Sequence, residues 1–201
     1  MSLSVLVVGP QASGKTSLVR RMMDQGFSEV YIPTDVVSVE FTSVKSEYSS
    51  RMTEISFLDT GGTERDVIEK YSDQDVYVVV YDLQNEKSME EIQPLVTQIE
   101  KVLRDYPYYR KPMVVIVGNK TDGERKIPAE KGLQNYNNYG TEQKAKYLET
   151  SAKTGENVPE LLKIILRKVE MMNSASRRSS DLPALNMAMS YSRKSACCNI
   201  L

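Results

Sequence analysis

The sequence predicts an α/β fold in which helices cover an open, mostly parallel sheet. Short apolar runs typical of strands alternate along the chain with amphipathic stretches typical of helices. Several of these runs are continuously apolar, as in strands that are buried on both faces. The length of 201 residues suits one domain with a tail, and 40% of the residues are hydrophobic, so a sizeable core is possible.

The first half of the chain predicts one helix between strand-like runs. An apolar run at Leu3–Val8 predicts a buried strand, and a helix is expected at Ser17–Gln25. Two further strand-like runs follow at Val36–Val44 and Met52–Leu58. The residues between these two runs are rich in Ser, Glu and Tyr, which predicts a turn there.

The second half continues the alternation. Buried strands are expected at Val76–Tyr81 and Met113–Val117. The helix between them is predicted to open with the capping box Ser88-Met-Glu-Glu91 and to be kinked by Pro94. A last helix is expected after the cap Asn157-Val-Pro-Glu160, with an apolar stripe formed by Leu161, Leu162, Ile165, Leu166 and Val169.

Composition divides the chain into two parts. Residues 173–201 contain seven Ser, four basic residues and one acid. Such a segment buries too little apolar surface to offset the loss of chain entropy on folding. We therefore expect a folded domain at residues 1–172 and a disordered, flexible tail at residues 173–201.

Charge and residue counts exclude several classes of function. The 26 Lys and Arg nearly balance the 27 Asp and Glu, which argues against a general nucleic-acid-binding protein. The absence of His and the presence of only Cys197 and Cys198 exclude His-based catalysis and a structural zinc cluster. The N-terminus does not resemble a signal peptide, and no apolar run approaches the ~18 residues of a membrane helix. We expect a protein of the reducing cytosol.

The strongest motif follows the first predicted strand and opens the first predicted helix. The segment from Gly9 to Thr16 matches the pattern G-x-x-x-x-G-K-[ST] of a phosphate-binding loop. Its glycines allow backbone N–H groups to surround an anion at a helix N-terminus. Lys15 is expected to reach the β- and γ-phosphates, and the Thr16 hydroxyl to ligate Mg²⁺. The nucleotide-contacting residues expected here are Gly9, Gln11, Ala12, Ser13, Gly14, Lys15, Thr16 and Ser17.

Three weaker motifs lie at the ends of other strands. Asp59, followed by a glycine pair, can hold Mg²⁺ through its water shell, and Gly62 can offer its N–H to a γ-phosphate. In Asn119-Lys120-Thr-Asp122 the Asp122 carboxylate can accept guanine N1–H and the exocyclic amino group, a donor pair that adenine lacks. Asn119 would tie neighbouring loops and face the purine edge, and the Lys120 stem would cover one face of the base. Glu149-Thr-Ser151-Ala152-Lys153 ends a sixth strand, where the Ala152 N–H can meet guanine O6.

Together and in this order, these segments resemble the Ras superfamily of small GTPases over about residues 3–172. The resemblance implies a six-stranded sheet with one antiparallel strand and five helices, which binds GTP or GDP with Mg²⁺. It implies that Thr34, in the switch I segment Tyr31-Ile-Pro-Thr34, closes on Mg²⁺ and the γ-phosphate. It also implies that the ring of Phe27 packs edge-on against guanine and that Tyr31, Ser151 and Lys153 belong to the nucleotide site.

The C-terminus fits the same class. Cys198-Asn-Ile-Leu201 matches a C-a-a-X box, whose terminal Leu favours geranylgeranylation, and Cys197 is a candidate for a second lipid. The alternative is two unmodified cysteines. We expect a monomer. Lipidation implies a location in the cytosol and on the cytoplasmic face of membranes, with a prenyl-binding chaperone as partner. The resemblance further implies an exchange factor, an activating protein and effectors.

The tail length and Ala152-Lys-Thr-Gly-Glu-Asn-Val resemble Rab proteins. The segment Ala12–Ser17, the pair Gly61-Gly62, the segment Ile127–Lys131 and the C-a-a-X ending together resemble the divergent Rab twenty-eight type, which implies vesicle or ciliary trafficking.

The chain departs from the family at the catalytic centre, where Thr63 stands in place of the Gln that orients the attacking water. Gln11 replaces a phosphate-loop glycine, where a side chain can crowd an arginine finger. We expect slow intrinsic hydrolysis, with Lys15, Thr34, Gly62 and Thr63 as the catalytic set.

Three alternatives remain open on the sequence. The first is a GTP-locked recruitment platform that lacks hydrolysis. The second is a phosphate-loop kinase or ATPase, against which the Asn119–Asp122 motif argues. The third is a structural protein at a membrane surface whose nucleotide site is vestigial.

Overall fold

The sheet has six strands in the order β2-β3-β1-β4-β5-β6. In this computed structural model the described residues are 2–45, 52–63, 66–104, 112–132 and 145–180. Strand β2 runs antiparallel to β3, and the other neighbouring strands are parallel. The strands are β1 (Ser2–Val8), β2 (Ser38–Lys45), β3 (Met52–Asp59), β4 (Val76–Asp82), β5 (Met113–Asn119) and β6 (Lys146–Thr150).

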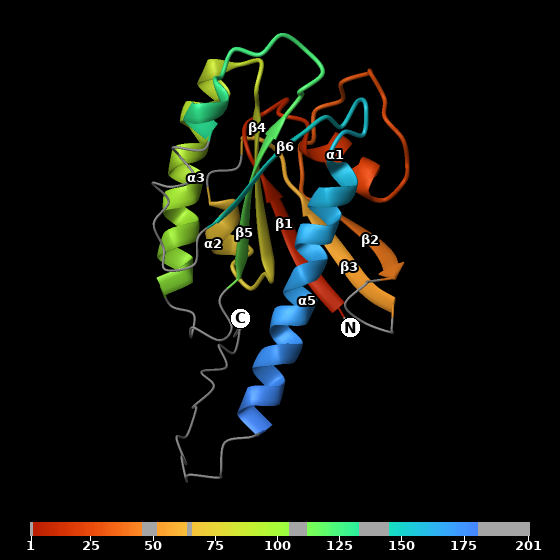
Figure 1. Cartoon of the computed structure of the whole chain (residues 1–201). Helices are drawn as coiled ribbons and strands as arrows, with labels where there is room; N and C mark the ends of the chain where they lie inside the picture. Colours follow the sequence, from red (N-terminus) through yellow and green to blue (C-terminus); the bar gives the residue numbers. More distant parts are fainter. Residues whose placement is uncertain (1, 46–51, 64–65, 105–111, 133–144, 181–201) are drawn as a thin grey trace, which may run out of the picture.

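Helices cover both faces of this sheet (Figure 1). They are α1 (Lys15–Met22), α2 (Val67–Lys70), α3 (Glu86–Arg104) and α5 (Val158–Ser180). Residues 129–132 add one further helical turn. The expected small-GTPase fold, with six strands, one of them antiparallel, and five helices, is confirmed.

Two apolar clusters, one on each face, explain the continuous apolar runs. Val5 and Val7 of β1 pack in the cluster that includes α1 and α5, whereas Leu6 and Val8 pack in the cluster that includes α2 and α3. Successive residues of a strand point to opposite faces, so a strand covered on both sides is apolar at every position. The predicted stripe of α5 is also confirmed, because four of its five residues are buried and Leu162 packs against the same cluster.

The start of α3 differs from the prediction. The helix begins at Glu86, two residues before the expected cap Ser88. The Lys87 N–H instead donates to Asn85 Oδ1 at 3.2 Å, so Asn85 caps the helix. Ser88 is buried, and its hydroxyl accepts the N–H of Asp82 at 2.8 Å. The helix continues unbroken on either side of Pro94.

The other helices differ from expectation at their ends. Helix α1 begins at Lys15 directly after Gly14, whose φ of 94° is left-handed, and it ends at Met22 rather than Gln25. Helix α5 runs to Ser180, so the first eight residues of the predicted tail are helical. Cys197 and Cys198 lie outside the described residues. Within the described part of the chain, no helix has the length and apolar character needed to cross a membrane.

Candidate functional site

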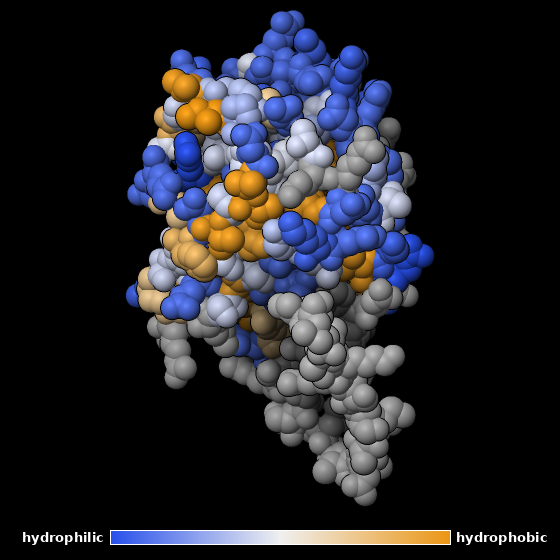
Figure 2. Space-filling view, turned by 180° about the vertical axis from the view of Figure 1, so that it is seen from behind, coloured by the Kyte–Doolittle hydropathy of each residue, from blue (hydrophilic) through white to orange (hydrophobic). Residues whose placement is uncertain are grey.

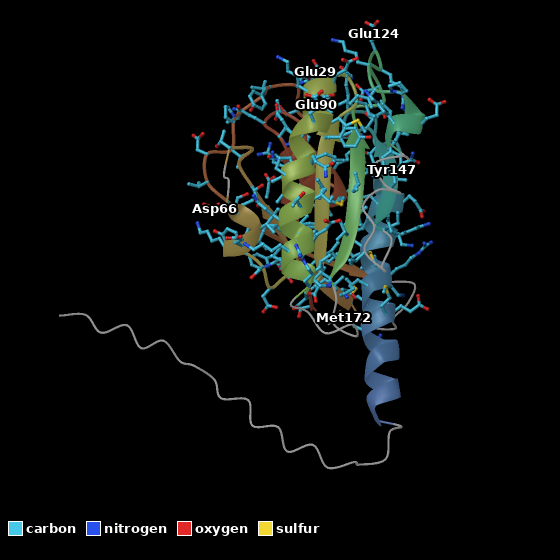
Figure 3. All side chains as sticks on the ribbon, turned by 90° about the vertical axis from the view of Figure 1, so that its left-hand side faces the viewer. Glu29, Asp66, Glu90, Glu124, Tyr147 and Met172 are labelled. Carbon is cyan, nitrogen blue, oxygen red and sulfur yellow. The ribbon has the colours of Figure 1, made fainter. Side chains whose placement is uncertain are left out.

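The predicted motifs come together because they all follow parallel strands. The carboxyl ends of β1, β3, β5 and β6 lead respectively into Gly9, Thr60, Lys120 and Ser151. Carboxyl ends of parallel strands share one edge of a sheet, which is where open α/β sheets bind ligands. Figure 3 shows Glu29 and Glu124 together at one end of the molecule and Met172 of α5 at the other. Helix α5 therefore leads away from the candidate site.

The phosphate loop is held in shape by close backbone approaches. A Cβ atom at Gly9 would lie 2.0 Å from the Val80 carbonyl oxygen, so only glycine fits there. Lys15 Nζ donates to the carbonyl oxygens of Gly9 and Pro10, both at 2.9 Å. Burial lowers the pKa of Lys15 to about 8, although the nearby Asp59 carboxylate partly offsets this. The buried ammonium and the backbone N–H groups make the loop an anion site.

Three side-chain oxygens converge beside Lys15. The Thr16 hydroxyl donates to Asp59 Oδ2 at 2.5 Å, and Thr16 Oγ1 lies 3.0 Å from Thr34 Oγ1. A hydroxyl has one proton, so with that of Thr16 directed to Asp59 the Thr34 hydroxyl donates to Thr16. Asp59 is 1% exposed, and its Oδ1 has no hydrogen-bond partner among the described residues. Burial raises the pKa of Asp59.

This set of oxygens fits Mg²⁺. Magnesium prefers oxygen ligands and commonly uses one or two carboxylates together with substrate phosphates. A cation at this position would satisfy the unpaired Asp59 Oδ1 and offset the cost of burying that carboxylate. Thr16, Thr34 and Asp59 are therefore the residues that would hold the metal, directly or through its water.

The glycine pair after Asp59 packs against both neighbouring segments. A Cβ atom at Gly61 would lie 2.5 Å from the Thr34 carbonyl oxygen, and one at Gly62 would lie 2.2 Å from the Gln11 nitrogen. The backbone after β3 thus touches the switch I segment and the phosphate loop at once. Gln11 and Thr63 are both exposed.

Asn119 joins three loops at the base of the site. It is buried, and its Nδ2 donates to the Ser13 carbonyl oxygen at 2.9 Å. Its Oδ1 accepts the Ala152 N–H at 3.1 Å and the Thr150 hydroxyl at 3.2 Å. The tie between loops expected of Asn119 is thus present. The same geometry directs the Ala152 N–H, which was expected to face guanine O6, to Asn119.

Several residues expected around the base are exposed, and we call them the rim of the site: Phe27, Tyr31, Asp122 and Lys153. Asp122 is exposed, and its Oδ1 accepts the Ser151 hydroxyl at 2.5 Å. Lys153 Nζ pairs with Glu29 Oε1 at 2.9 Å across the rim. The Lys153 ammonium lowers the pKa of Glu29, and Glu29 raises the pKa of Lys153. Phe27 is 38% exposed, an unusual state for a phenylalanine, and Tyr31 is also exposed.

The sequence interpretation missed the residues that support this rim. Asp82 and Gln84 both bind Lys120, through its ammonium and its carbonyl oxygen. Arg125 forms an ion pair with Glu149 and so joins the segment after β5 to β6. Asp82 directly follows the apolar run Val76–Tyr81, and an acid at the end of a buried strand could have been recognised as a candidate site residue. Nothing in the local sequence indicated the partners of Gln84 or Arg125.

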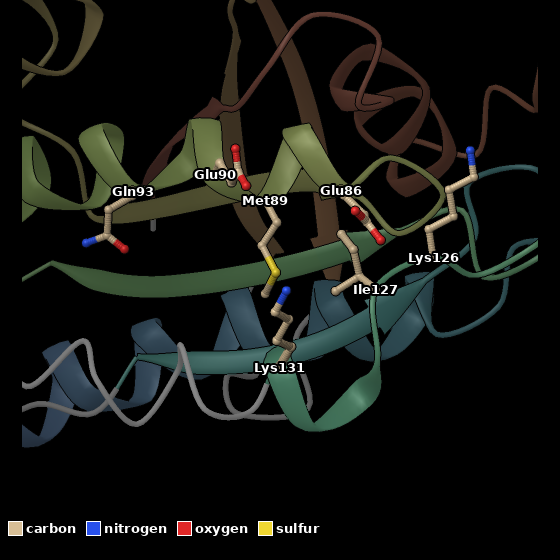
Figure 4. Close-up of a pocket in the computed structure, with 7 residues that line it drawn as sticks. All are labelled: Glu86, Met89, Glu90, Gln93, Lys126, Ile127 and Lys131. Atoms are coloured by element: carbon tan, nitrogen blue, oxygen red, sulfur yellow. The ribbon is translucent and has the colours of Figure 1, made fainter.

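A separate hollow lies between α3 and the segment around Ile127 (Figure 4). Its volume is about 390 Å³, and it is lined by Glu86, Met89, Glu90, Gln93, Lys126, Ile127 and Lys131. None of the predicted nucleotide-site residues lines it.

Comparison with known proteins agrees with this geometry. A sequence model described as the Ras family matches residues 4–171. The chain is also similar to the Ras-related protein RabC of Dictyostelium discoideum: the identity is 26% over 199 residues, and the match covers 96% of each chain.

Proposed function

The chain belongs to the Ras family of small GTP-binding switches, and we propose that it is a Rab-like switch with slow intrinsic hydrolysis that works on membranes in vesicle or ciliary trafficking. The observation that carries the nucleotide site is the convergence of Thr16, Thr34 and Asp59 beside the buried Lys15. These groups come from three separate segments of the chain. Together they provide oxygen ligands for a cation and an ammonium for the phosphates to which that cation binds.

In this proposal the phosphate loop binds the nucleotide phosphates. Lys15 would turn from the loop carbonyls to the β- and γ-phosphates, and Thr16, Thr34 and Asp59 would hold Mg²⁺. When bound, the metal neutralises the charge that develops on the phosphates. The Gly62 N–H would bind the γ-phosphate; this role is supported by the close approach of Gly62 to the phosphate loop, where a Cβ atom at Gly62 would lie 2.2 Å from the Gln11 nitrogen.

The rim would select guanine. Asp122 would accept the two donors of the guanine edge, and Ser151 holds this carboxylate in place. Lys120 and Phe27 would enclose the base, while Asn119 fixes the loop between them and the phosphate site. Burying Asp122 against a base that lacks matching donors would be costly, so discrimination against adenine should be large.

Switching would follow from the contacts of Thr34. With GTP and Mg²⁺ bound, Thr34 and Gly62 would both be held at the γ-phosphate, and loss of that phosphate would release both segments. Beside Thr34, the residues Val36, Val39 and Phe41 expose apolar side chains, with Val36 74% and Phe41 73% exposed. Figure 2 views the molecule from behind, where apolar side chains gather on the surface. We place effector binding on the exposed apolar side chains of Val36, Val39 and Phe41.

Slow hydrolysis would follow from Thr63. A threonine side chain is too short to hold both the attacking water and the γ-phosphate as glutamine does. Gln11 adds bulk where an arginine finger would enter. The alternative, a GTP-locked recruitment platform, differs from this proposal only in its rate of GTP hydrolysis. Hydrolysis stimulated by an activating protein that supplies a Gln and an Arg would favour the switch over the platform.

Membrane attachment would use Cys198, and also Cys197 where a second lipid is added. A single lipid gives marginal binding, so the basic residues of the tail or a second chain would be needed. Helix α5 leads away from the nucleotide site (Figure 1), so the described part of the chain ends away from that site.

Nucleotide exchange tests this function. The full chain is loaded with a fluorescent N-methylanthraniloyl (mant) derivative of GDP and then mixed with excess GTP or ATP. We expect GTP to displace the label, ATP at the same concentration to leave it bound, and removal of Mg²⁺ by EDTA to speed its release. Equal displacement by ATP would contradict the guanine site and favour the kinase or ATPase alternative.

A further inference from the structure

Lys120 is held at both ends by the last residue of β4 and by the turn that follows this strand. Its ammonium pairs with Asp82 Oδ2 at 2.6 Å. Its backbone carbonyl oxygen accepts the Gln84 side-chain N–H at 3.0 Å. Asp82 and Gln84 lie more than 35 residues away in sequence, so these contacts join two separate loops.

The backbone of Lys120 needs such support. Its φ is 72°, in the left-handed region that residues with a side chain rarely adopt. A conformation of this kind persists where the surroundings fix it. The Lys120 carbonyl is fixed by Gln84, and also by the Gly123 N–H at 3.4 Å. These two hydrogen bonds to the Lys120 carbonyl therefore help to fix the shape of the turn over residues 120–123.

Asp82 is itself aimed at Lys120. Its backbone N–H donates to the Ser88 hydroxyl at 2.8 Å, and its Oδ1 accepts the Gln84 N–H at 2.9 Å. With these two groups fixed, Oδ2 is directed at the ammonium. The side chains of Asp82 and Lys120 are 13% and 33% exposed, so water screens this ion pair less than it screens a surface pair.

We propose that Asp82 and Gln84 are positioning residues that set how long guanine nucleotide stays bound. The inference rests on the proposed function, in which the stem of Lys120 covers one face of the base. Asp82 and Gln84 act through Lys120: they hold its stem and its backbone turn in the conformation that encloses the base. Loss of either contact lets Lys120 move away, which should raise the dissociation rate.

The substitution Asp82→Asn tests the ion pair with little other change. The amide keeps an acceptor for the Gln84 N–H and removes the charge that Lys120 binds. We expect the release of mant-GDP in the presence of Mg²⁺ to speed up by about tenfold, as for loss of a charge-assisted hydrogen bond. Gln84→Ala should change the rate in the same direction, because it frees the Lys120 carbonyl.

A double-substitution cycle separates positioning from a general effect on the fold. In a Lys120→Met chain the ammonium is absent, so adding Asp82→Asn should change the rate less than twofold. Glu90→Gln, an equal loss of charge on exposed α3, should leave the rate unchanged. The thermal midpoint of each variant confirms that it is folded.

Two results would overturn the inference. One is a rate within twofold of the native chain for Asp82→Asn, and the other is an equal acceleration in the native and Lys120→Met chains. A native chain that fails to retain mant-GDP overturns the proposed function together with this inference. Retention by the native chain, with either of the first two results, overturns the inference alone.

Discussion

The hydroxyl oxygens of Thr16 and Thr34 lie 3.0 Å apart, although 18 residues separate them in sequence. Thr16 belongs to the phosphate loop and Thr34 to the segment that would report the γ-phosphate. Their contact places switch I against the metal site, and the Thr34 carbonyl oxygen rests on the backbone of Gly61. In the proposed switch, Thr34 is therefore the residue that would couple the metal site to the exposed apolar residues beside it.

Thr34→Val tests this coupling, because valine keeps the shape and removes the hydroxyl. We expect GTP with Mg²⁺ to dissociate faster by about tenfold, since one oxygen of the metal site is lost, and GDP to dissociate at nearly the native rate. Stopped-flow release of mant-GTP and mant-GDP measures both. Thr97→Val on exposed α3 is the matched control. Equal effects on the two nucleotides would show that Thr34 does not sense the γ-phosphate.

Asp122→Asn should change the base that is recognised. An amide cannot accept both guanine donors, but it can pair with xanthine, which carries a carbonyl where guanine has its amino group. We expect the affinity for GDP to fall by roughly 10²-fold or more, since the polar groups of the guanine edge lose their partner, and the affinity for xanthosine diphosphate to rise. Competition against mant-GDP reports both affinities.

Glu124→Gln is the control for Asp122, because it removes the same charge from an exposed side chain two residues away in sequence. It should keep the native preference for guanine. An Asp122→Asn chain that still prefers GDP over the xanthine nucleotide would place base selection elsewhere.

The lowered pKa of Lys15 predicts weaker nucleotide binding at alkaline pH. Without nucleotide, Lys15 loses its proton above about pH 8, whereas bound phosphates favour the charged form. Binding above that pH must therefore take up a proton, and affinity should fall as pH rises, by at most about tenfold per pH unit. Titration calorimetry between pH 7 and 9 measures the affinity and the proton uptake together.

Lys15→Arg serves as the control for this pH dependence, because a guanidinium stays charged throughout the range. Any fall in affinity that remains in this variant reports other groups, including the base itself. A native affinity that follows the same profile as Lys15→Arg would contradict the assignment to Lys15.

Asn119→Ala should loosen the whole site at once. It removes the bonds to the Ser13 carbonyl and the Ala152 N–H, which join the phosphate loop to the loop after β6. Two buried hydrogen bonds at about 1 kcal/mol each correspond to a release of GDP roughly 30-fold faster. Thr150→Val, which removes only one of the hydrogen bonds of Asn119, should have a smaller effect. Equal rates for the two variants would show that Asn119 does not join the loops.

The sequence was informative wherever local pattern decides structure. The continuous apolar runs at β1 and β4 predicted strands buried on both faces, and the glycine loop before Lys15 predicted a phosphate site. The pairing of Asp82 with Lys120 was not predictable, because it depends on β4 lying beside β5. The start of α3 was misplaced because Asn85 caps it, which left Ser88 inside the first turn.

The most direct test of the account is single-turnover hydrolysis of GTP bound to the full chain, with Mg²⁺ present and bound nucleotide followed in parallel. Thr63 predicts that GTP stays bound and is cleaved at or below about 10⁻⁴ s⁻¹, and that Thr63→Gln raises this rate. A native rate equal to that of a relative with glutamine at this position, unchanged by Thr63→Gln, would contradict the account and would mean that another residue orients the attacking water.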